Sequence, residues 1–264
     1  MPVHPVDRPE GAMSELEGRH AVVTGGGSGI GAAIAAALGG AGAMVTIAGR
    51  RTAPLQEIAR EHPQIEGISC DVTDEASVTA LFEQAGRRAP VDIVIANAGI
   101  AESNPFDRTP LDQWQRIMDI NLTGVFLTLR EGYRGMKGRD YGRLIAISSI
   151  AGVRGYGYVA PYCASKHGVV GLVRALARET AGKGITANSI CPGYAETPML
   201  ERSVDTIRAK TGMNDEDARK SLSAANPAGH FIQPGEVASA ALWLCGHEAR
   251  SVTGQAITIS GGDP

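Results

Sequence analysis

The chain has 264 residues, 43% of them hydrophobic, which is enough to bury the core of one α/β domain or of two small ones. Its 25 Lys and Arg against 28 Asp and Glu give a net charge of −3 without any basic block, so a nucleic-acid partner bound through positive charge is excluded. The four cysteines are widely scattered: Cys70, Cys163, Cys191 and Cys245. They form no Cys-x-x-Cys pair, which argues against a zinc site and against a disulfide framework. Reduced thiols in a cytoplasmic protein are therefore expected.

The first 17 residues are predicted to form a disordered leader, and residues 18–264 a single domain. The leader begins with MPVHPVDRPEGA, which carries several prolines and no apolar core, unlike a signal peptide. The uncharged run 21–49 is long enough to suggest a transmembrane helix, but it is crowded with glycine and divides into strand, loop, helix and strand. We therefore expect no membrane association.

An apolar strand at 20–24 leads into the sequence TGGGSGIG, which is typical of a loop that binds nucleotide phosphates. Gly25 permits a tight turn, Gly29 lets the backbone approach a pyrophosphate, and Gly31 allows close packing of the next helix. That helix, expected at 32–40, directs its N-terminal amides and its dipole toward the phosphates. No Lys-Ser or Lys-Thr pair follows the glycines, which excludes a P-loop; a merely flexible turn is the alternative.

Strands and helices alternate along almost the whole chain. Further strands are expected at 43–48, 64–70, 91–96, 144–147, 185–191 and 255–259, and helical segments at 111–136, from Pro161 onward, and at 234–246. Such alternation predicts an α/β fold with a doubly wound, Rossmann-like parallel sheet, helices on both faces and strand order 3-2-1-4-5-6. A polar segment at 198–227, with loosely helical apolar spacing, is interpreted as a lid above a ligand.

The candidate catalytic residues follow the fifth expected strand. That strand delivers Ser149 to its carboxyl end, and Tyr162 and Lys166 lie four residues apart on one face of the next helix. A neighbouring ammonium favours a phenolate, so Lys166 is expected to lower the pKa of Tyr162 and let it exchange a proton near neutral pH. Ser149 can donate a hydrogen bond to the reacting oxygen. For Tyr-x-x-x-Lys alone, an exposed helix face is the alternative.

A serine ahead of this tyrosine at a strand end, together with the glycine spacing G-x-x-x-G-x-G, makes the chain resemble the short-chain dehydrogenase/reductase family over residues 18–262. The resemblance implies a seventh strand, a nicotinamide cofactor, and catalysis by Ser149, Tyr162 and Lys166. No metal is expected. The contacts with the cofactor are expected from Gly25, Ser28, Gly29, Ile30, Gly31, Arg50, Asp71, Val72, Asn97, Gly99, Tyr162, Lys166, Pro192, Gly193, Ala195 and Thr197.

Four of the roles implied by the resemblance have local alternatives. Asp71 is expected to contact the adenine, or it caps the following helix. Asn97 is expected beside the adenosine, or it braces the sheet. Asn121, a poor helix former inside 111–136, is expected to hold a water in a proton relay to the lysine, or it is a core amide with satisfied hydrogen bonds. Thr197 is expected to bond the nicotinamide carboxamide, or it forms an ordinary turn.

NADP is predicted over NAD. Enzymes that prefer NAD usually end the second strand with Asp or Glu, whereas this chain has Gly49 followed by Arg50 and Arg51. A guanidinium suits the 2′-phosphate of NADP, and Arg50 is nearest the strand end. Against this, Ser28 stands where many relatives that prefer NADP carry a basic residue, and the arginines could simply be solvated, so NAD stays open.

The predicted activity is hydride transfer between NADP(H) and a carbonyl or secondary alcohol. The lid and the sequences ETPM and QPGEV resemble 3-oxoacyl-thioester and polyketide ketoreductases, so a 3-oxoacyl thioester or related β-keto compound is expected. Alternatives are a small secondary alcohol, a steroid or a sugar-derived alcohol; a sensor that binds nucleotide without turnover; and an epimerase or dehydratase. Basic lid residues could meet thioester phosphates or form a solvated face: Arg202, Arg208, Lys210, Arg219 and Lys220.

The resemblance also implies a homotetramer, assembled through the long helices after strands four and five and the C-terminal region. Leu122, Val125, Phe126 and Leu129 have the apolar spacing that such an interface needs. Packing in the core would explain the same spacing, and the sequence does not distinguish a dimer from a tetramer.

Overall fold

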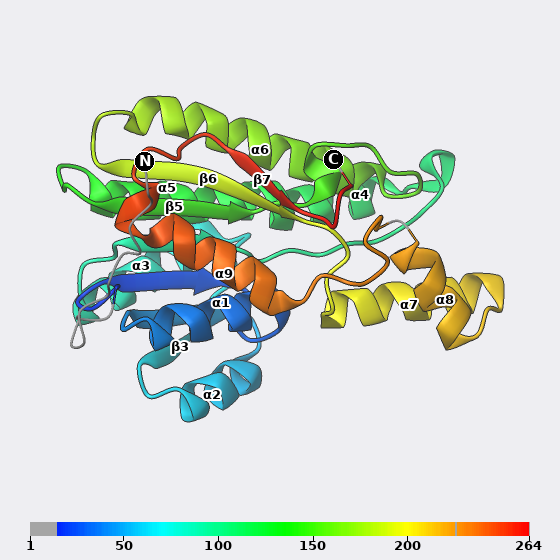
Figure 1. The fold of residues 1–264 in the computed structure, drawn as a ribbon, viewed down its shortest axis with the longest axis horizontal. Coiled ribbons are helices and arrows are strands. Elements are labelled where there is room, and N and C mark those ends of the chain that lie inside the picture. Colours follow the sequence, from blue (N-terminus) through cyan, green and yellow to red (C-terminus); the bar gives the residue numbers. More distant parts are fainter. Residues whose placement is uncertain (1–14, 225, 264) are drawn as a thin grey trace, which may run out of the picture.

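The computed structural model describes residues 15–224 and 226–263. Its centre is a parallel seven-stranded sheet with the order β3-β2-β1-β4-β5-β6-β7 (Figure 1). The predicted order and the seventh strand are confirmed. The strands are β1 (His20–Thr24), β2 (Met44–Gly49), β3 (Ile65–Ser69), β4 (Ile93–Ala96), β5 (Gly142–Ile147), β6 (Ile185–Pro192) and β7 (Ala256–Ile259).

Helices cover both faces of the sheet, so every residue of the central strands β4 and β5 is buried. The helices are α1 (Gly29–Gly40), α2 (Thr52–Glu61), α3 (Glu75–Arg88), α4 (Leu111–Met118), α5 (Gly124–Met136), α6 (Ala160–Thr180), α7 (Pro198–Thr211), α8 (Asp215–Ser223) and α9 (Pro234–Cys245). The core of one face joins the sheet to α1 and α9, and that of the other joins it to α3, α5 and α6. Among the described residues, no helix is long and apolar enough to cross a bilayer.

The predicted helical region 111–136 is not one regular helix. A π-helical turn, Asp119–Thr123, separates α4 from α5 and contains Asn121. Single π-turns of this kind are often found at functional sites. A poor helix former therefore marks the position at which the hydrogen-bond pattern changes.

The predicted leader boundary needs a correction. Residues 1–14 lie outside the described residues, but 15–17 form a turn, and Leu16 is only 2% exposed within the core that includes α1. The Leu16 N–H donates to the carbonyl of Ala41 at 3.0 Å. Leu16 follows a serine and a glutamate in a polar stretch, so its apolar side chain is a weak signal of burial on its own.

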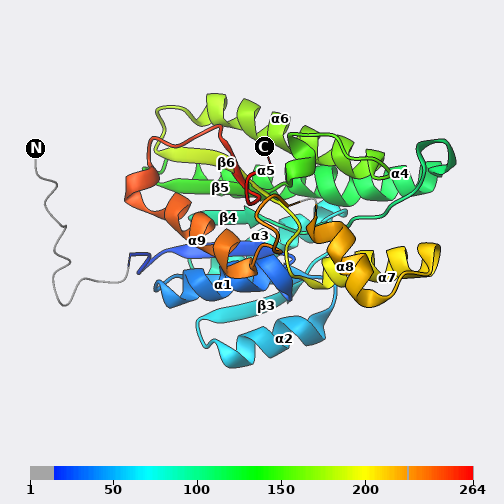
Figure 2. The ribbon, with the colours of Figure 1, turned by 45° about the vertical axis from the view of Figure 1, so that its right-hand side comes forward.

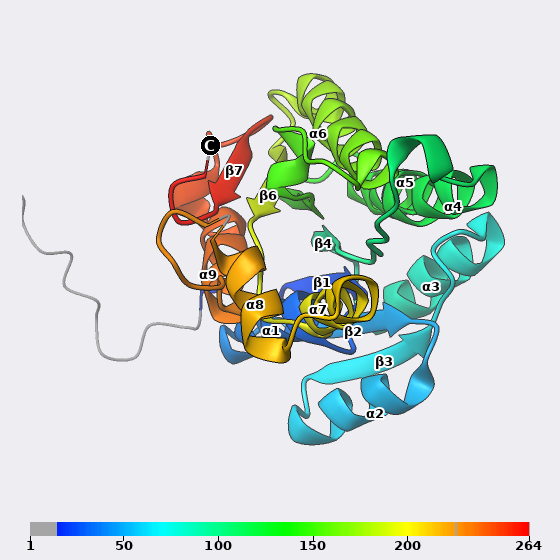
Figure 3. The same cartoon turned by 90° about the vertical axis from the view of Figure 1, so that its right-hand side faces the viewer.

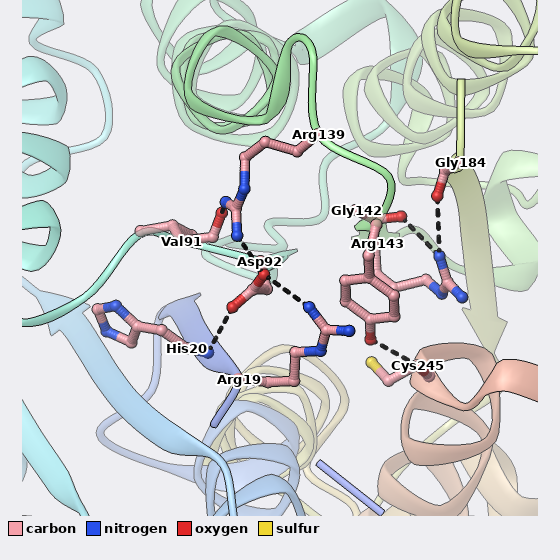
Figure 4. Close-up of polar contacts among 10 residues, drawn as sticks. Arg19, His20, Val91, Asp92, Arg139, Gly142, Arg143, Gly184 and Cys245 are labelled. Atoms are coloured by element: carbon pink, nitrogen blue, oxygen red, sulfur yellow. Dashed lines mark hydrogen bonds and ion pairs between the residues drawn. The ribbon is translucent and has the colours of Figure 1, made fainter. Parts of the chain in front are cut away.

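An ion-pair network lies at the amino-terminal ends of the strands (Figure 4). The buried carboxylate of Asp92 accepts from the guanidinium of Arg19 at 3.2 Å, from the backbone N–H of His20 at 3.0 Å, and from Arg139. These contacts connect β1 to the loops before β4 and β5. The network lies at the end of the strands opposite to the candidate catalytic residues.

A buried arginine, Arg143, lies at the same end of the strands. Arg143 is 2% exposed, and its guanidinium donates to the carbonyls of Gly142, Gly184 and Gly246. Burial lowers the pKa of Arg143, which also lies 4.2 Å above the ring of Tyr141. Backbone oxygens and an aromatic face thus replace a carboxylate partner.

The predicted lid is two helices, α7 and α8, beyond the carboxyl ends of the strands (Figures 2 and 3). A small cluster of Leu200, Val204 and Ala218 packs the helices together. Tyr194 and Phe231, from the segments that enter and leave the lid, pack against that cluster.

Candidate active site

The loop between β1 and α1 has a backbone path that only glycine permits. Gly25 and Gly29 have φ angles of +67° and +54°, in the left-handed region. A Cβ on Gly31 would lie 2.3 Å from the carbonyl oxygen of Gly25, so the helix packs directly on the loop. Helix α1 begins at Gly29 and not at residue 32, which brings its free N-terminal amides into the glycine loop. The cradle fits a dinucleotide phosphate group.

Asn97 holds this loop from β4. Its amide donates to the carbonyls of Thr24 at 2.9 Å and Gly25 at 3.2 Å, and its backbone N–H donates to the Thr24 hydroxyl. The bracing role is therefore present, and contact with the adenosine stays a prediction.

Ser149 follows β5 and caps a short 3-10 turn, Ile150–Gly152. Its oxygen accepts the backbone N–H of Ala151 at 3.1 Å. The hydroxyl proton is left to point toward the phenol of Tyr162, where the contact opposes part of the rise in that group's pKa. Ser149 is 8% exposed, so this donor is largely shielded from water.

The neighbouring Ser148 has a role that the sequence interpretation did not assign. Its hydroxyl donates to the carbonyl of Lys166 at 3.0 Å and fixes α6 against the end of β5. A Cβ on Gly152 would lie 2.4 Å from this hydroxyl, so glycine is needed there. The Ser-Ser pair and the glycines after it were the available sequence signal.

Tyr162 and Lys166 lie in the first two turns of α6, as predicted, with the ammonium 5.7 Å from the centre of the phenol ring. Lys166 is 4% exposed, and its ammonium donates to the carbonyl of Ile147 at 2.9 Å. The lysine is thus held beside the end of β5, next to Ser149.

The predicted pKa shift of the tyrosine is wrong for this form of the protein. Burial raises the pKa of Tyr162 to about 12, and Lys166 is not among the groups that lower it. Burial also lowers the pKa of Lys166 to about 8, which leaves the lysine mostly charged at pH 7 but close to its titration range. Desolvation therefore dominates over the attraction between the ammonium and the phenolate.

Asn121 is completely buried and uses its whole amide in the protein. Its oxygen accepts the N–H of Ile100 at 2.8 Å, and its nitrogen donates to the carbonyl of Ile100 and to the hydroxyl of Ser165. A Cβ on Gly99 would lie 3.3 Å from this amide oxygen and 3.6 Å from the Lys166 ammonium. Asn121 is therefore both a core amide with satisfied hydrogen bonds and a neighbour of the lysine, and the relay stays a prediction.

The segment after β6 reaches back to the glycine loop. Thr197 caps α7, accepting the N–H of Leu200, and its hydroxyl donates to the carbonyl of Ala195 at 3.2 Å. Its methyl carbon lies 3.1 Å from the position of a Cβ on Gly29. The alternative turn role is thus present, and the fold also brings Thr197 to the glycine loop.

Arg50 and Asp71 lie at the carboxyl ends of β2 and β3. The Asp71 carboxylate accepts the N–H of Thr73 at 3.0 Å, which lowers the pKa of Asp71, with a smaller contribution from Arg50. The cap of α3 is Asp74 and not Asp71. Asp71 therefore shapes the turn, and exposed Arg50 lies near enough to act on its charge.

The remaining predicted contacts differ in what their side chains do. Val72 is buried, and a Cβ on Gly124 would lie 2.8 Å from its side chain, so it packs against α5. Ile30 packs against the core around α1, so it can offer a ligand mainly backbone groups, as can Pro192, Gly193 and Ala195. Ser28 is exposed at the start of α1 and makes no cap hydrogen bond with its side chain, so its hydroxyl can also meet a ligand.

A Rossmann-like sheet that carries a glycine cradle and a Ser–Tyr–Lys cluster at the same edge defines an oxidoreductase that uses a nicotinamide cofactor. Residues 19–208 match the short chain dehydrogenase family. The chain belongs to that family, whose members interconvert alcohols and carbonyls.

Similar proteins cover almost the whole chain. A 3-oxoacyl-[acyl-carrier-protein] reductase of Vibrio cholerae is 35% identical over 253 residues, 94% of this chain and 98% of the relative. D-beta-hydroxybutyrate dehydrogenase of Rhizobium meliloti is 35% identical over 252 residues, 92% and 97% of the two chains. The structure of a variant of actinorhodin polyketide ketoreductase with NADPH matches with a TM-score of 0.89 and 36% identity, covering 92% and 96%.

Proposed function

We propose that this protein reduces the ketone of a 3-oxoacyl thioester or related β-keto compound with NADPH. The observation that carries the proposal is the convergence of Ser149, Tyr162 and Lys166 beside the glycine loop. Similarity to a 3-oxoacyl-[acyl-carrier-protein] reductase and to a polyketide ketoreductase supports the substrate class. A sensor without turnover would need none of these three side chains.

In this mechanism, the residues bind the ketone oxygen and deliver a proton to it. The bound cofactor supplies hydride to the carbonyl carbon. Ser149 donates a hydrogen bond to the oxygen as negative charge develops. Tyr162, with its pKa at about 12, stays protonated at neutral pH and acts as the general acid. Lys166, with a pKa near 8, can return a proton to the phenolate, with Asn121 supporting the relay.

For the reverse oxidation the same Tyr162 would act as the base, and burial, which raises its pKa, works against that role in the protein without cofactor.

The substrate class is tested by NADPH oxidation with acetoacetyl-CoA, simple ketones, and ketones derived from steroids and sugars. Turnover of acetoacetyl-CoA is expected, and activity restricted to sugars would reject the thioester.

Three of the five basic lid residues already have partners: Arg208 with Asp205 and Asp215, Arg219 with Glu201 and Asp215, and Lys210 with the carbonyl of Ser103. This leaves Arg202 and Lys220 as candidates for thioester phosphates.

The cofactor proposal makes a specific prediction for Arg50→Ala. The exposed guanidinium at the end of β2 is positioned to bind the 2′-phosphate that only NADP carries. Loss of a charged hydrogen bond costs about 1.5–3 kcal/mol, so the KM for NADPH should rise on the order of tenfold or more while that for NADH changes little. Steady-state kinetics with both cofactors measures this. Arg51→Ala is the matched control, and equal effects on both cofactors would contradict the assignment.

We also propose a cytoplasmic homotetramer of single-domain subunits, in which the domain includes the buried Leu16 ahead of the predicted boundary. The four cysteines are free thiols, which supports a reducing compartment. Of the predicted interface residues, Val125 and Leu129 are 2% exposed and belong to the core, and Leu122 packs against that core. Phe126, on α5, is 41% exposed, and Trp114 on α4, a residue that the prediction did not include, is 38% exposed. A monomer in light scattering at micromolar concentration would contradict the assembly.

A further inference from the structure

The loop between the two catalytic residues Ser149 and Tyr162 is tied to the C-terminal end of the chain. Asp263 is 4% exposed, and its carboxylate accepts from the guanidinium of Arg154 and from the phenol of Tyr156. These contacts span more than 100 residues of sequence. Burial and this hydrogen bond raise the pKa of Tyr156, so its hydroxyl remains a donor.

The same loop contains a strained residue that needs such support. Tyr158 has a φ angle of +69°, the only positive value at a residue other than glycine in the described segments, and is 71% exposed. Strained backbone persists only where neighbouring contacts impose it. On one side of the loop, the carbonyl of Tyr158 accepts the N–H of Asn104 at 2.8 Å. The bonds from Arg154 and Tyr156 to Asp263 hold the other side.

The turn at residues 260–263 packs against two other segments near the site. A Cβ on Gly193 would lie 3.4 Å from the Cα of Ser260, so the turn borders the segment after β6. A Cβ on Gly261 would lie 2.1 Å from the amide oxygen of Asn226, at the end of the lid. The turn 260–263 thus touches both the catalytic loop and the lid exit.

We propose that Asp263 is a positioning residue that sets the catalytic loop for the carbonyl substrate. Asp263 acts through Arg154 and Tyr156. This positioning role rests on the proposed function only in assuming that the substrate binds between this loop and the lid. The glycine loop after β1, Arg50 after β2 and Asn97 after β4 make no hydrogen bond with Asp263 in the described structure. Of the expected cofactor contacts after β6, Gly193 meets the turn at Ser260 and not at Asp263. Loss of Asp263 should therefore impair the substrate and spare the cofactor.

The test compares Asp263→Asn with wild type in the complete chain. Misplacing a reacting group by a small distance costs about ten- to a hundredfold, so kcat/KM for the ketone should fall by at least tenfold while the Kd for NADPH, from its fluorescence, is unchanged. Asp263→Glu keeps the carboxylate and should recover part of the loss. Glu66→Gln is the control. Glu66 lies on β3, the edge strand opposite to β7, and pairs with Arg88. Its loss should leave both kcat/KM for the ketone and the Kd for NADPH unchanged.

Hydrogen exchange separates this proposal from the proposed function. In Asp263→Asn, amides at 150–160 should exchange faster, and those of β1 and α1 should not. That result would support the positioning role even if no β-keto thioester is turned over by wild type, which would reject only the proposed function. Unchanged exchange at 150–160, or equal losses for ketone and NADPH, would overturn the positioning role.

Discussion

Replacing Tyr162 by phenylalanine is expected to lower kcat by a factor on the order of 10² or more, since general acid catalysis is typically worth that much. The phenol is the group that stays protonated at neutral pH in the site, and the ring itself would remain in place on α6. Single-turnover oxidation of NADPH with excess ketone measures the chemical step directly. Binding of NADPH should be retained, because the glycine cradle is untouched.

Tyr133→Phe is the matched control. It removes a phenol from α5 whose oxygen accepts only the ammonium of Lys183 at 3.3 Å in the described structure. Turnover should be normal in this variant. If folded Tyr162→Phe is as active as Tyr133→Phe, the tyrosine is not the general acid.

Asp92→Asn is expected to cause the largest loss of stability, about 3 kcal/mol. The substitution keeps the shape but removes the charge that Arg19 and Arg139 share, and it removes one of the oxygens that accept from Arg19, His20 and Arg139. The cost is set near the lower end for a buried pair, because Arg19 and Arg139 are 38% and 30% exposed and can turn toward water. Urea unfolding measures the change.

Glu102→Gln provides the comparison, since Glu102 pairs with Arg116 at an exposed position. Exposed pairs contribute little, so its unfolding midpoint should stay close to that of wild type. Equal unfolding midpoints for both variants would show that the ion-pair network around Asp92 does not stabilise the fold.

The sequence determined the order of the elements and indicated the candidate residues of the site. Apolar strand runs, a glycine loop after the first of them and right-handed crossovers leave few topologies, and the sheet has the predicted order. Ser149, Tyr162 and Lys166 were predicted from a strand end, a four-residue helical spacing and the family resemblance. Gly25 and Gly31 were predicted to permit a tight turn and close helix packing, and a Cβ at either position would clash.

Only the tertiary structure decided which partner each polar group has. Helical spacing brings Tyr162 and Lys166 together, but their pKa values depend mainly on burial, which no local pattern specifies. Nor does a local pattern specify the Ile147 carbonyl as the partner of the lysine. Likewise, the place of Leu16 in the core is set by α1 and α9, distant in sequence.

The tie between Asp263 and the catalytic loop shows the same limit. An aspartate after two glycines near the chain end has the local pattern of a solvated turn. Its burial against Arg154 and Tyr156 follows from the position of β7 at the sheet edge beside β6, which brings the end of the chain to the loop after β5. Long-range pairing of this kind depends on the whole sheet, because local sequence records periodicity and turn chemistry but not which distant segments meet.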